Sequence, residues 1–233
     1  MAGSTPSKTY ILVLLILSST HLLNDLMQSL IPASYPILKT KYALSFVQIG
    51  IITFTFQIFG AFLQPIMGMI TDRHPAPYSP ILGMVFTLSG LVSLAFAKNY
   101  ELILISVALI GIGSSIFHPE ATRMARYAAG GQQGLAQGIF QVGGQSGGAL
   151  GPLFAALIIV PWGLSSLSWF SALGILTIVL LFWIGKQQNR IRAEFSTMQE
   201  QRKIKTVSPV HGTLTICLGL FVLTFLMFIK NFY

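Results

Sequence analysis

Three polar residues lie in the middle of the first long apolar stretch, where they could bind and release a proton. His21 and Asp25 are four positions apart, which places both side chains on one face of a helix, and Asn24 lies beside them. The stretch from Leu12 to Pro36 is otherwise mostly apolar and is long enough to cross a bilayer, which takes about 20 residues. Because an ionisable pair is costly in lipid, we expect these side chains to face a protein interior or a watery cavity.

The chemistry predicted for these residues centres on Asp25. Burial favours the neutral form of a carboxylate and a nearby cation favours the charged form, so the charge of Asp25 can change with what occupies the cavity. An unperturbed imidazole titrates near neutral pH. We therefore expect Asp25 to carry a proton, with His21 and Asn24 lining its path. The alternative is a static hydrogen-bonded cluster that only joins helices.

Composition indicates a protein that crosses the membrane several times. The 233 residues are 53% hydrophobic and only 9% charged, whereas soluble domains carry about 25% charged residues. The net charge of +8 would suggest nucleic acid as a partner of a soluble protein. Here the basic residues lie mostly between apolar runs, so we expect a lipid bilayer and no nucleic acid. The single cysteine, Cys217, excludes an intrachain disulfide.

Hydropathy predicts six complete membrane spans and the start of a seventh. The approximate limits of the six are 10–33, 46–70, 79–97, 102–122, 135–159 and 166–185. Together they predict a transmembrane bundle over 10–185. Outside it we expect an N-terminal tail at 1–9, a basic loop at 186–212 and an incomplete helix at 213–233. A cleaved secretory signal is disfavoured, because polar residues follow the first apolar run without an Ala-x-Ala-like site.

Basic residues are unevenly distributed among the segments between spans. The N-terminal tail and the second, fourth and last connections hold ten Lys and Arg residues, and the other three hold three. The positive-inside rule therefore predicts a cytoplasmic N-terminus and a cytoplasmic basic loop. This loop is either a solvated linker or a binding segment for anionic lipid.

A faint internal repeat relates the first and fourth spans. In both, small hydroxyl residues precede a histidine and then a carboxylate, at Ser18 to Asp25 and at Ser114 to Glu120. The two spans cross in opposite directions, which is typical of inverted three-helix repeats in transporters.

The end of the fourth span carries residues that could form a gate. Pro119 is expected to kink the helix, and Glu120 and Arg123 are spaced to pair with each other. The pair is either an interfacial anchor or a gate contact with the second connection, which holds Asp72 and Arg73.

The fifth span carries glutamines followed by glycines. Gln137, Gln141 and Gln145 are spaced four apart, and we expect them to line a polar cavity or else to cross-link helices. Glycines at the same spacing are expected to let helices approach closely. These glycines are the pair Gly144 and Gly148 and the pair Gly147 and Gly151, which Pro152 follows.

Sequence motifs of soluble enzymes are absent. The glycine clusters lack the spacing and the preceding strand of a nucleotide-binding loop, and there is no Gly-x-Ser-x-Gly elbow. The four histidines lack metal-ligand spacing such as His-Glu-x-x-His. The sequence therefore predicts no enzyme, no cofactor and no metal.

Several strings resemble a family of transporters. Gly68-Met-Ile-Thr-Asp72-Arg73 resembles the Gly-x-x-x-Asp-Arg signature between helices 2 and 3 of the major facilitator superfamily. Gly147-Gly-Ala-Leu-Gly151-Pro152 resembles the helix-5 antiporter signature of that superfamily. Three further strings are similar to the fosmidomycin resistance protein group of bacterial drug exporters. These are Ser19-Thr-His-Leu-Leu-Asn-Asp25, Gly113-Ser-Ser-Ile-Phe-His-Pro-Glu120 and Ile139-Phe-Gln-Val-Gly-Gly144.

The resemblance implies an all-α polytopic protein of the bacterial inner membrane. The chain would be the six-helix N-terminal half of a major facilitator fold, a 3+3 inverted repeat, plus a truncated seventh helix. In this family helices 1, 4, 7 and 10 line the substrate path. Lys230, in a Lys-x-Phe-Tyr string of helix 7, would then face Asp25 across the cavity of a complete protein. His118, Gln141 and Gln145 would line the same path.

The function implied is proton-coupled efflux of fosmidomycin-like or other small drugs, so protons and a small molecule are the expected partners. A chain of half length would work with a separate C-terminal half or with a second copy of itself. The alternative is a truncated, non-transporting product of a broken or split gene. An intramembrane enzyme is disfavoured because no nucleophile–base set is apparent.

Overall fold

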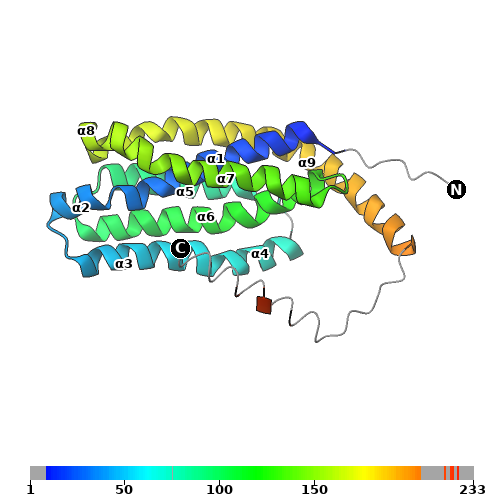
Figure 1. Ribbon diagram of the computed structural model, residues 1–233, viewed down its shortest axis with the longest axis horizontal. Coiled ribbons are helices and arrows are strands. Elements are labelled where there is room, and N and C mark those ends of the chain that lie inside the picture. The colour runs from blue at the N-terminus through cyan, green and yellow to red at the C-terminus, as the bar shows by residue number, and fades with distance from the viewer. Residues whose placement is uncertain (1–8, 75, 206–217, 219–220, 223–224, 226–233) are drawn as a thin grey trace. The chain divides into compact units, whose positions relative to one another are not determined.

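Helices form every regular element in the part of the chain that the computed structural model describes (Figure 1). That part comprises residues 9–74, 76–205, 218, 221–222 and 225. The chain divides into a first unit, residues 1–195, and a second, residues 196–233, and each is treated by itself. The predicted all-α class is confirmed.

Six long helical segments make up the first unit. Five are long and apolar enough to cross a membrane, and the third, α5, is apolar but shorter. In chain order they are α1 (Ile11–Ala33); α3 (Phe46–Gln57) with η1 (Ile58–Phe62) and α4 (Leu63–Arg73); α5 (Ser79–Ala95); α6 (Tyr100–Ala128); α7 (Gln133–Phe154) with η2 (Ala155–Ile159) and α8 (Val160–Trp162); and η3 (Leu164–Phe170) with α9 (Ser171–Lys205). The short helix α2 (Tyr35–Tyr42) connects the first two segments.

Local sequence explains where several of these helices begin and end. Ser45 and Gln48 form a capping box at the start of α3, with each side chain bonded to the backbone N–H of the other. The Asn99 side chain accepts a hydrogen bond from the Leu102 N–H at 3.0 Å and so caps α6. Gly130 supplies the positive φ, 55°, that the turn after α6 requires.

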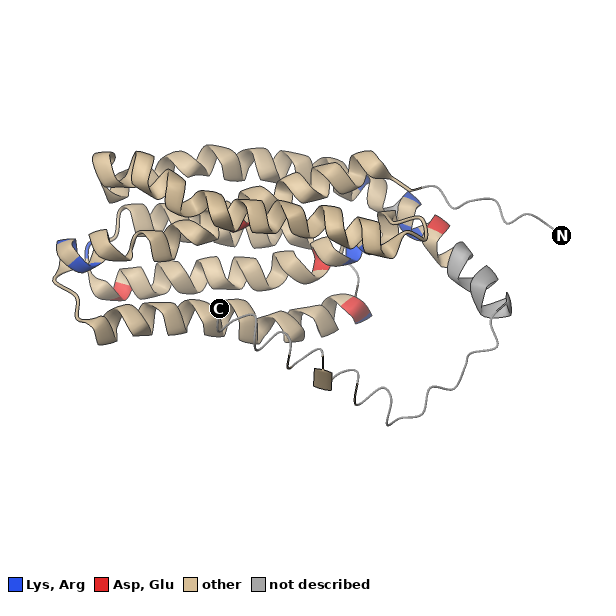
Figure 2. Ribbon diagram, in the orientation of Figure 1, with Lys and Arg blue, Asp and Glu red and all other residues tan. Residues whose placement is uncertain are grey.

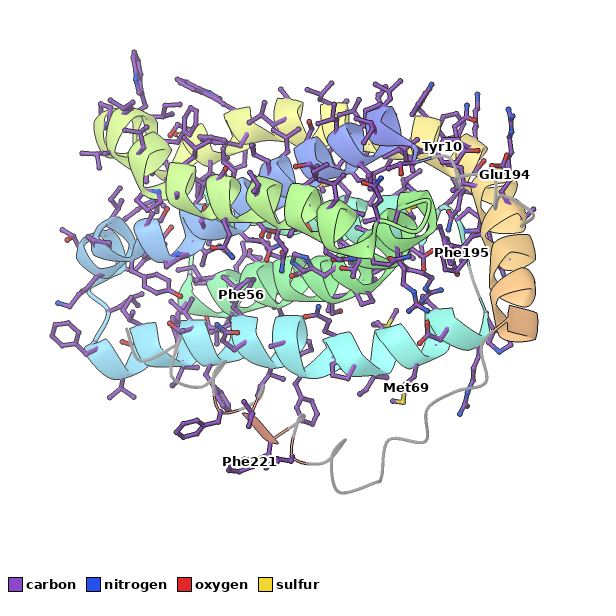
Figure 3. The ribbon with its side chains drawn as sticks, turned by 45° about the vertical axis from the view of Figure 1, so that its right-hand side comes forward. Tyr10, Phe56, Met69, Glu194, Phe195 and Phe221 are labelled. Carbon is purple, nitrogen blue, oxygen red and sulfur yellow. The ribbon has the colours of Figure 1, made fainter. Side chains whose placement is uncertain are left out.

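The last helix extends beyond its predicted end, which corrects part of the expected loop at 186–212. Residues 186–205 contain no proline or glycine and are rich in helix-forming Gln, Arg, Lys and Glu, so α9 continues to Lys205. Within the first unit, Glu194 of α9 accepts a hydrogen bond from the Tyr10 hydroxyl (Figure 3). That bond holds the pKa of Tyr10 above its usual range. The start of α1 is thereby joined to α9. The expected tail up to residue 8 and nearly all of the expected seventh helix lie outside the described residues.

Two parallel helix pairs show the relation expected of an inverted repeat. The α7 glycines Gly143, Gly147 and Gly151 lie against α1 so closely that an added Cβ on any of them would overlap its atoms. In the same way, a Cβ on Gly111 of α6 would lie 2.9 Å from the backbone N of Gly60 in η1. The first segment thus packs on the fifth as the fourth packs on the second, which is the 3+3 arrangement.

Charged residues of the first unit gather mainly near the two ends of the bundle (Figure 2). Along its length, large apolar side chains such as Phe54, Phe62 and Leu157 are exposed. This distribution suits a bundle whose central part is surrounded by hydrocarbon.

Candidate functional site

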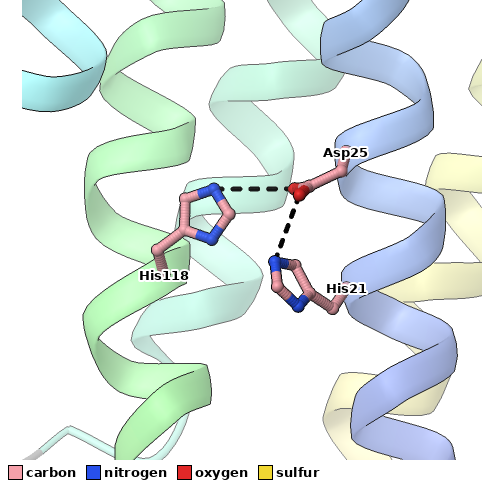
Figure 4. Close-up of side chains that lie close together, drawn as sticks. All are labelled: His21, Asp25 and His118. Atoms are coloured by element: carbon pink, nitrogen blue, oxygen red, sulfur yellow. Dashed lines mark ion pairs between the residues drawn. The ribbon is translucent and has the colours of Figure 1, made fainter. Parts of the chain in front are cut away.

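Asp25 lies between two histidines from different helices (Figure 4). Its Oδ2 atom is 3.2 Å from Nε2 of His21, one turn earlier in α1, and its Oδ1 atom is 3.6 Å from Nε2 of His118 in α6. The Asn24 amide donates a hydrogen bond to Oδ1 at 3.1 Å. The structure therefore brings together four of the seven residues that the sequence placed on one path, and we call these four the histidine–aspartate cluster.

The backbone of α7 determines which nitrogen of His21 carries hydrogen. His21 Nδ1 is 2.9 Å from the Phe140 carbonyl oxygen, and the imidazole stacks on the Phe140 ring with centroids 4.0 Å apart. A carbonyl oxygen only accepts, so Nδ1 must carry a hydrogen. In neutral His21, Nε2 then presents a lone pair to a carboxylate oxygen. The contact at 3.2 Å is attractive only when a proton lies between the two atoms.

Exposure differs among the three ionisable side chains. The His21 side chain is 5% exposed, that of His118 is 19% exposed, and that of Asp25 is 25% exposed. The carboxylate is therefore the member that faces open space. One ligand-type atom from each residue lies within 4.8 Å of the others, and two imidazoles with a carboxylate could also hold a metal ion. The donors lie on two helices far apart in sequence, so local spacing gave no sign of this set.

A cavity of about 260 Å³ opens beside Asp25. Its polar lining comes from α1, which includes Asp25, and from α2 and α3, and α7 contributes Gly148. The further polar lining residues are Gln28, Ser29, Tyr35, Thr53 and Gln57. Sequence reasoning missed all five, although Gln28 is three positions after Asp25 and thus on the same helix face.

Two contacts orient this lining. Ser114 of α6 donates a hydrogen bond to Gln28 Oε1 at 3.0 Å, and the buried Nε2 of Gln28 has no partner among the described residues. Thr53 donates to the Tyr35 hydroxyl at 2.9 Å. Gln28, one of the residues that line the cavity, therefore carries a buried amide donor without a partner in the part of the chain that the structure describes.

The glutamines of α7 occupy different positions. Gln141 and Gln145 lie on an exposed face, two turns and one turn before Gly148, and do not line the described cavity. Gln137 reaches the Thr122 carbonyl of α6 at 3.4 Å, so it cross-links two helices. Lys230 lies outside the described residues.

Arg123 is the centre of a second cluster, at the end of the bundle where α4 and α6 end. Its guanidinium is 3.0 Å from Asp72 of α4 and 3.2 Å from Glu120 one turn earlier. It also bonds the hydroxyl and the carbonyl of Thr71. Glu120 is fully buried and accepts a hydrogen bond from Gln188 of α9 at 2.9 Å.

This arginine cluster joins three helices, α4, α6 and α9. Asp72, which the sequence placed in the second connection, lies in the last turn of α4 and contacts Arg123, whereas Arg73 is exposed. Pro119 lies within α6, which continues through it without ending.

Of the two α7 glycine pairs expected from sequence to pack closely, only the pair Gly147 and Gly151 does so. Gly147 and Gly151 meet α1, but Gly148 has nothing within 4 Å of an added Cβ, and Gly144 meets side chains of the histidine–aspartate cluster. The packing stripe is instead Gly143, Gly147 and Gly151, because residues four apart lie on one helix face. Pro152 lies within α7 next to Gly151.

Comparisons with known proteins agree with this architecture. The sequence profile of the Major Facilitator Superfamily matches residues 17–233. The chain is 45% identical over 232 residues to the fosmidomycin resistance protein of Escherichia coli, covering 100% of this chain and 56% of that protein. It is 44% identical over 181 residues to the MFS-type transporter YfnC of Bacillus subtilis, covering 78% of this chain and 44% of that protein.

The fold is also similar to a solved transporter structure. A bacterial homologue of the human lysosomal transporter Spinster, in an inward-facing and occupied conformation, superposes with a TM-score of 0.67 at 21% identity. The match covers 78% of this chain and 45% of that one. The chain spans about half the length of the relatives it matches. By its sequence profile and its close relative, this protein belongs to the major facilitator superfamily of membrane transporters.

Proposed function

We propose that the chain is the N-terminal half of a drug exporter that exchanges its substrate for protons, with Asp25 as the residue that takes up and releases the proton. The observation that carries the proposal is the contact between His21 Nε2 and Asp25 Oδ2, which is attractive only with a proton between them. An ionisable group at membrane depth beside a polar cavity is the usual location of such a site.

The residues of the histidine–aspartate cluster would act in sequence. With the proton bound, His21 and Asp25 stay in contact and the cavity beside them carries less negative charge. When the proton leaves, the lone pair of His21 Nε2 and the Asp25 carboxylate face each other and repel. The two side chains would then separate, or Asp25 would pair with His118, which lies 3.6 Å from its other oxygen. Asp25 thus presents a different charge to the cavity in each state, so substrate and proton bind in alternation.

The substrate would be a small drug of the kind named for the Escherichia coli relative, which is a fosmidomycin resistance protein. It would pass Asp25, with Gln141 and Gln145 on the face of α7 that a second half covers and Lys230 opposite in helix 7. The arginine cluster would be the gate at the cytoplasmic end, since it joins α4, α6 and α9 there. Access would alternate as this half rocks against the other.

The chain would lie in the bacterial inner membrane with its N-terminus in the cytoplasm, as the distribution of basic residues predicts. The chain spans about half the length of its relatives, so the C-terminal half of such a transporter would complete the proposed path.

Susceptibility to fosmidomycin tests the proposal in cells that express the chain alone or with a C-terminal half from a full-length relative. We expect resistance when both halves are present, loss of resistance in Asp25→Asn, and partial retention in Asp25→Glu. Everted vesicles should show a substrate-dependent discharge of the pH gradient. Normal resistance in Asp25→Asn would overturn the assignment of Asp25, as would a metal ion retained by the purified protein. Correct insertion without resistance in any pairing would overturn the proposed transport function.

A further inference from the structure

The glycines of α7 meet three kinds of surroundings. A Cβ on Gly143, Gly147 or Gly151 would overlap atoms of α1, and one on Gly148 would enter open space. Gly144 also meets α1, but it differs from the first group because all three atoms nearest to its missing Cβ belong to the ionisable side chains of His21 and Asp25. Its surroundings are the histidine–aspartate cluster itself.

A Cβ at position 144 would fit only if the His21 or Asp25 side chain moved. A Cβ there would lie 2.5 Å from His21 Nε2 and 2.9 Å from Asp25 Oδ2, and real Cβ atoms essentially never approach within 3.0 Å. The backbone of Gly144 is ordinary α-helix, so no special φ requires glycine. Alanine would also be the better helix former. The requirement for glycine at this position therefore comes from the space that it leaves for the His21 and Asp25 side chains.

Gly144 and Phe140 together form the surface of α7 against which the His21 ring lies. Phe140, one turn earlier, accepts the Nδ1 hydrogen on its carbonyl and stacks its ring on the imidazole. Gly144 then leaves Nε2 free to reach Asp25. Two residues four apart thus control the tautomer of His21 and the position of its second nitrogen.

We propose that Gly144 is a positioning residue of the proton site: by having no side chain, it keeps His21 Nε2 and Asp25 Oδ2 close enough to share one proton. The inference rests on the proposed function for its role in transport, but the geometry it concerns can be measured without transport.

Few other groups could produce a change in titration at this place. The ionisable side chains that contact Asp25 are His21 from α1 and His118 from α6. α7 and α5 carry no ionisable side chain, and those of α3, η1 and α4 are Asp72 and Arg73 at the far end of α4. Tyr35 of α2 lines the cavity with Asp25 and accepts a hydrogen bond from Thr53, and Glu120 of α6 lies on the opposite face from His118 and contacts Gln188. An effect of Gly144→Ala on titration would therefore act through His21, Asp25 and His118.

The test is an NMR titration of the imidazole nitrogens in the full chain, labelled at histidine and held in lipid nanodiscs. The four histidines are assigned with single His→Gln variants. If an added Cβ separates His21 and Asp25 by roughly 1 Å, the proton affinity of the pair should fall about tenfold, moving the midpoint by about one pH unit. Gly138→Ala, in the same helix but outside the cavity lining and with nothing within 4 Å of an added Cβ, is the matched control and should leave the titration unchanged. A wild-type titration in Gly144→Ala would overturn the proposal.

A second variant covers the case in which Gly144→Ala does not fold. His21→Ala removes the ring that the new Cβ meets, so the double variant His21→Ala/Gly144→Ala should recover helical content and stability. If the double variant also fails to fold, Gly144 serves helix packing and the proposal is wrong.

Asp25→Asn separates this proposal from the proposed function. If the titration of His21 is the same in Asp25→Asn as in the wild type, the two side chains share no proton and the proposed function loses its carrier. If Asp25→Asn changes the titration and Gly144→Ala does not, the proton site stands and only the positioning role fails.

Discussion

Removing Arg123 should destabilise the bundle far more than removing Asp72, although both are partners in one ion pair. Glu120 is fully buried, whereas the Asp72 side chain is 74% exposed. In Arg123→Met the Glu120 carboxylate keeps the Gln188 amide but loses its cation, and a buried charge left in this way costs about 3–5 kcal/mol. Asp72→Asn removes an exposed partner and should cost about 1 kcal/mol or less.

A double variant isolates the reason for the difference. In Arg123→Met/Glu120→Gln no charge is buried, and the side chain at 120 can still accept the hydrogen bond from Gln188. Most of the loss in Arg123→Met should therefore be recovered. The variants are compared by SDS-induced unfolding in mixed micelles, followed by circular dichroism, with Arg73→Met as the control because Arg73 is exposed. Equal losses in Arg123→Met and Asp72→Asn, or additive losses in the double variant, would refute this reasoning.

Three smaller predictions concern packing and the start of α1. Gly147→Ala should destabilise the bundle by about 1–3 kcal/mol, because the new Cβ overlaps α1 and the core must overpack. Gly148→Ala should stabilise it by about 0.5–1 kcal/mol, because it only improves helix propensity, and the same unfolding assay measures both. Tyr10→Phe should loosen α9, seen as faster amide exchange around Glu194. The pKa of Tyr10 is higher in the folded than in the unfolded protein. The stability from this bond should therefore be fully present when the pH is below the pKa of unfolded Tyr10, and it should be lost as the pH rises through the pKa of folded Tyr10.

The positions of the helices could be predicted from the sequence because hydropathy depends on local composition. The polar group at His21 and Asp25 stood out for the same reason, since charge is costly within an apolar run. Gln28 could have been found by helical spacing, whereas Tyr35 and Thr53 reach the cavity from other elements. Their contribution depends on how the chain folds back, which no local pattern contains.

The glycines of α7 show most clearly what sequence could not provide. Spacing four apart predicted close packing, yet both Gly143–Gly147 and Gly144–Gly148 have that spacing. Which pair faces α1 depends on the rotation of α7 about its axis, and that rotation is set by tertiary contacts such as the bond from Ser18 to the Ile139 carbonyl. A tertiary contact also acts on α9. This helix continues beyond its apolar stretch because the following residues have high helix propensity and because Tyr10 bonds Glu194.

Helix α6 connects the two polar clusters. His118 contacts Asp25 of α1, while Glu120, two residues later, contacts Gln188 of α9. Residues two apart on a helix project about 200° from each other, so these contacts lie on nearly opposite faces of α6. A rotation of α6 that lengthens the first contact must also move the second, because the helix between them is continuous. Helix α6, continuous through Pro119, thus links the contact at Asp25 to the end of the bundle where Arg123 contacts α4.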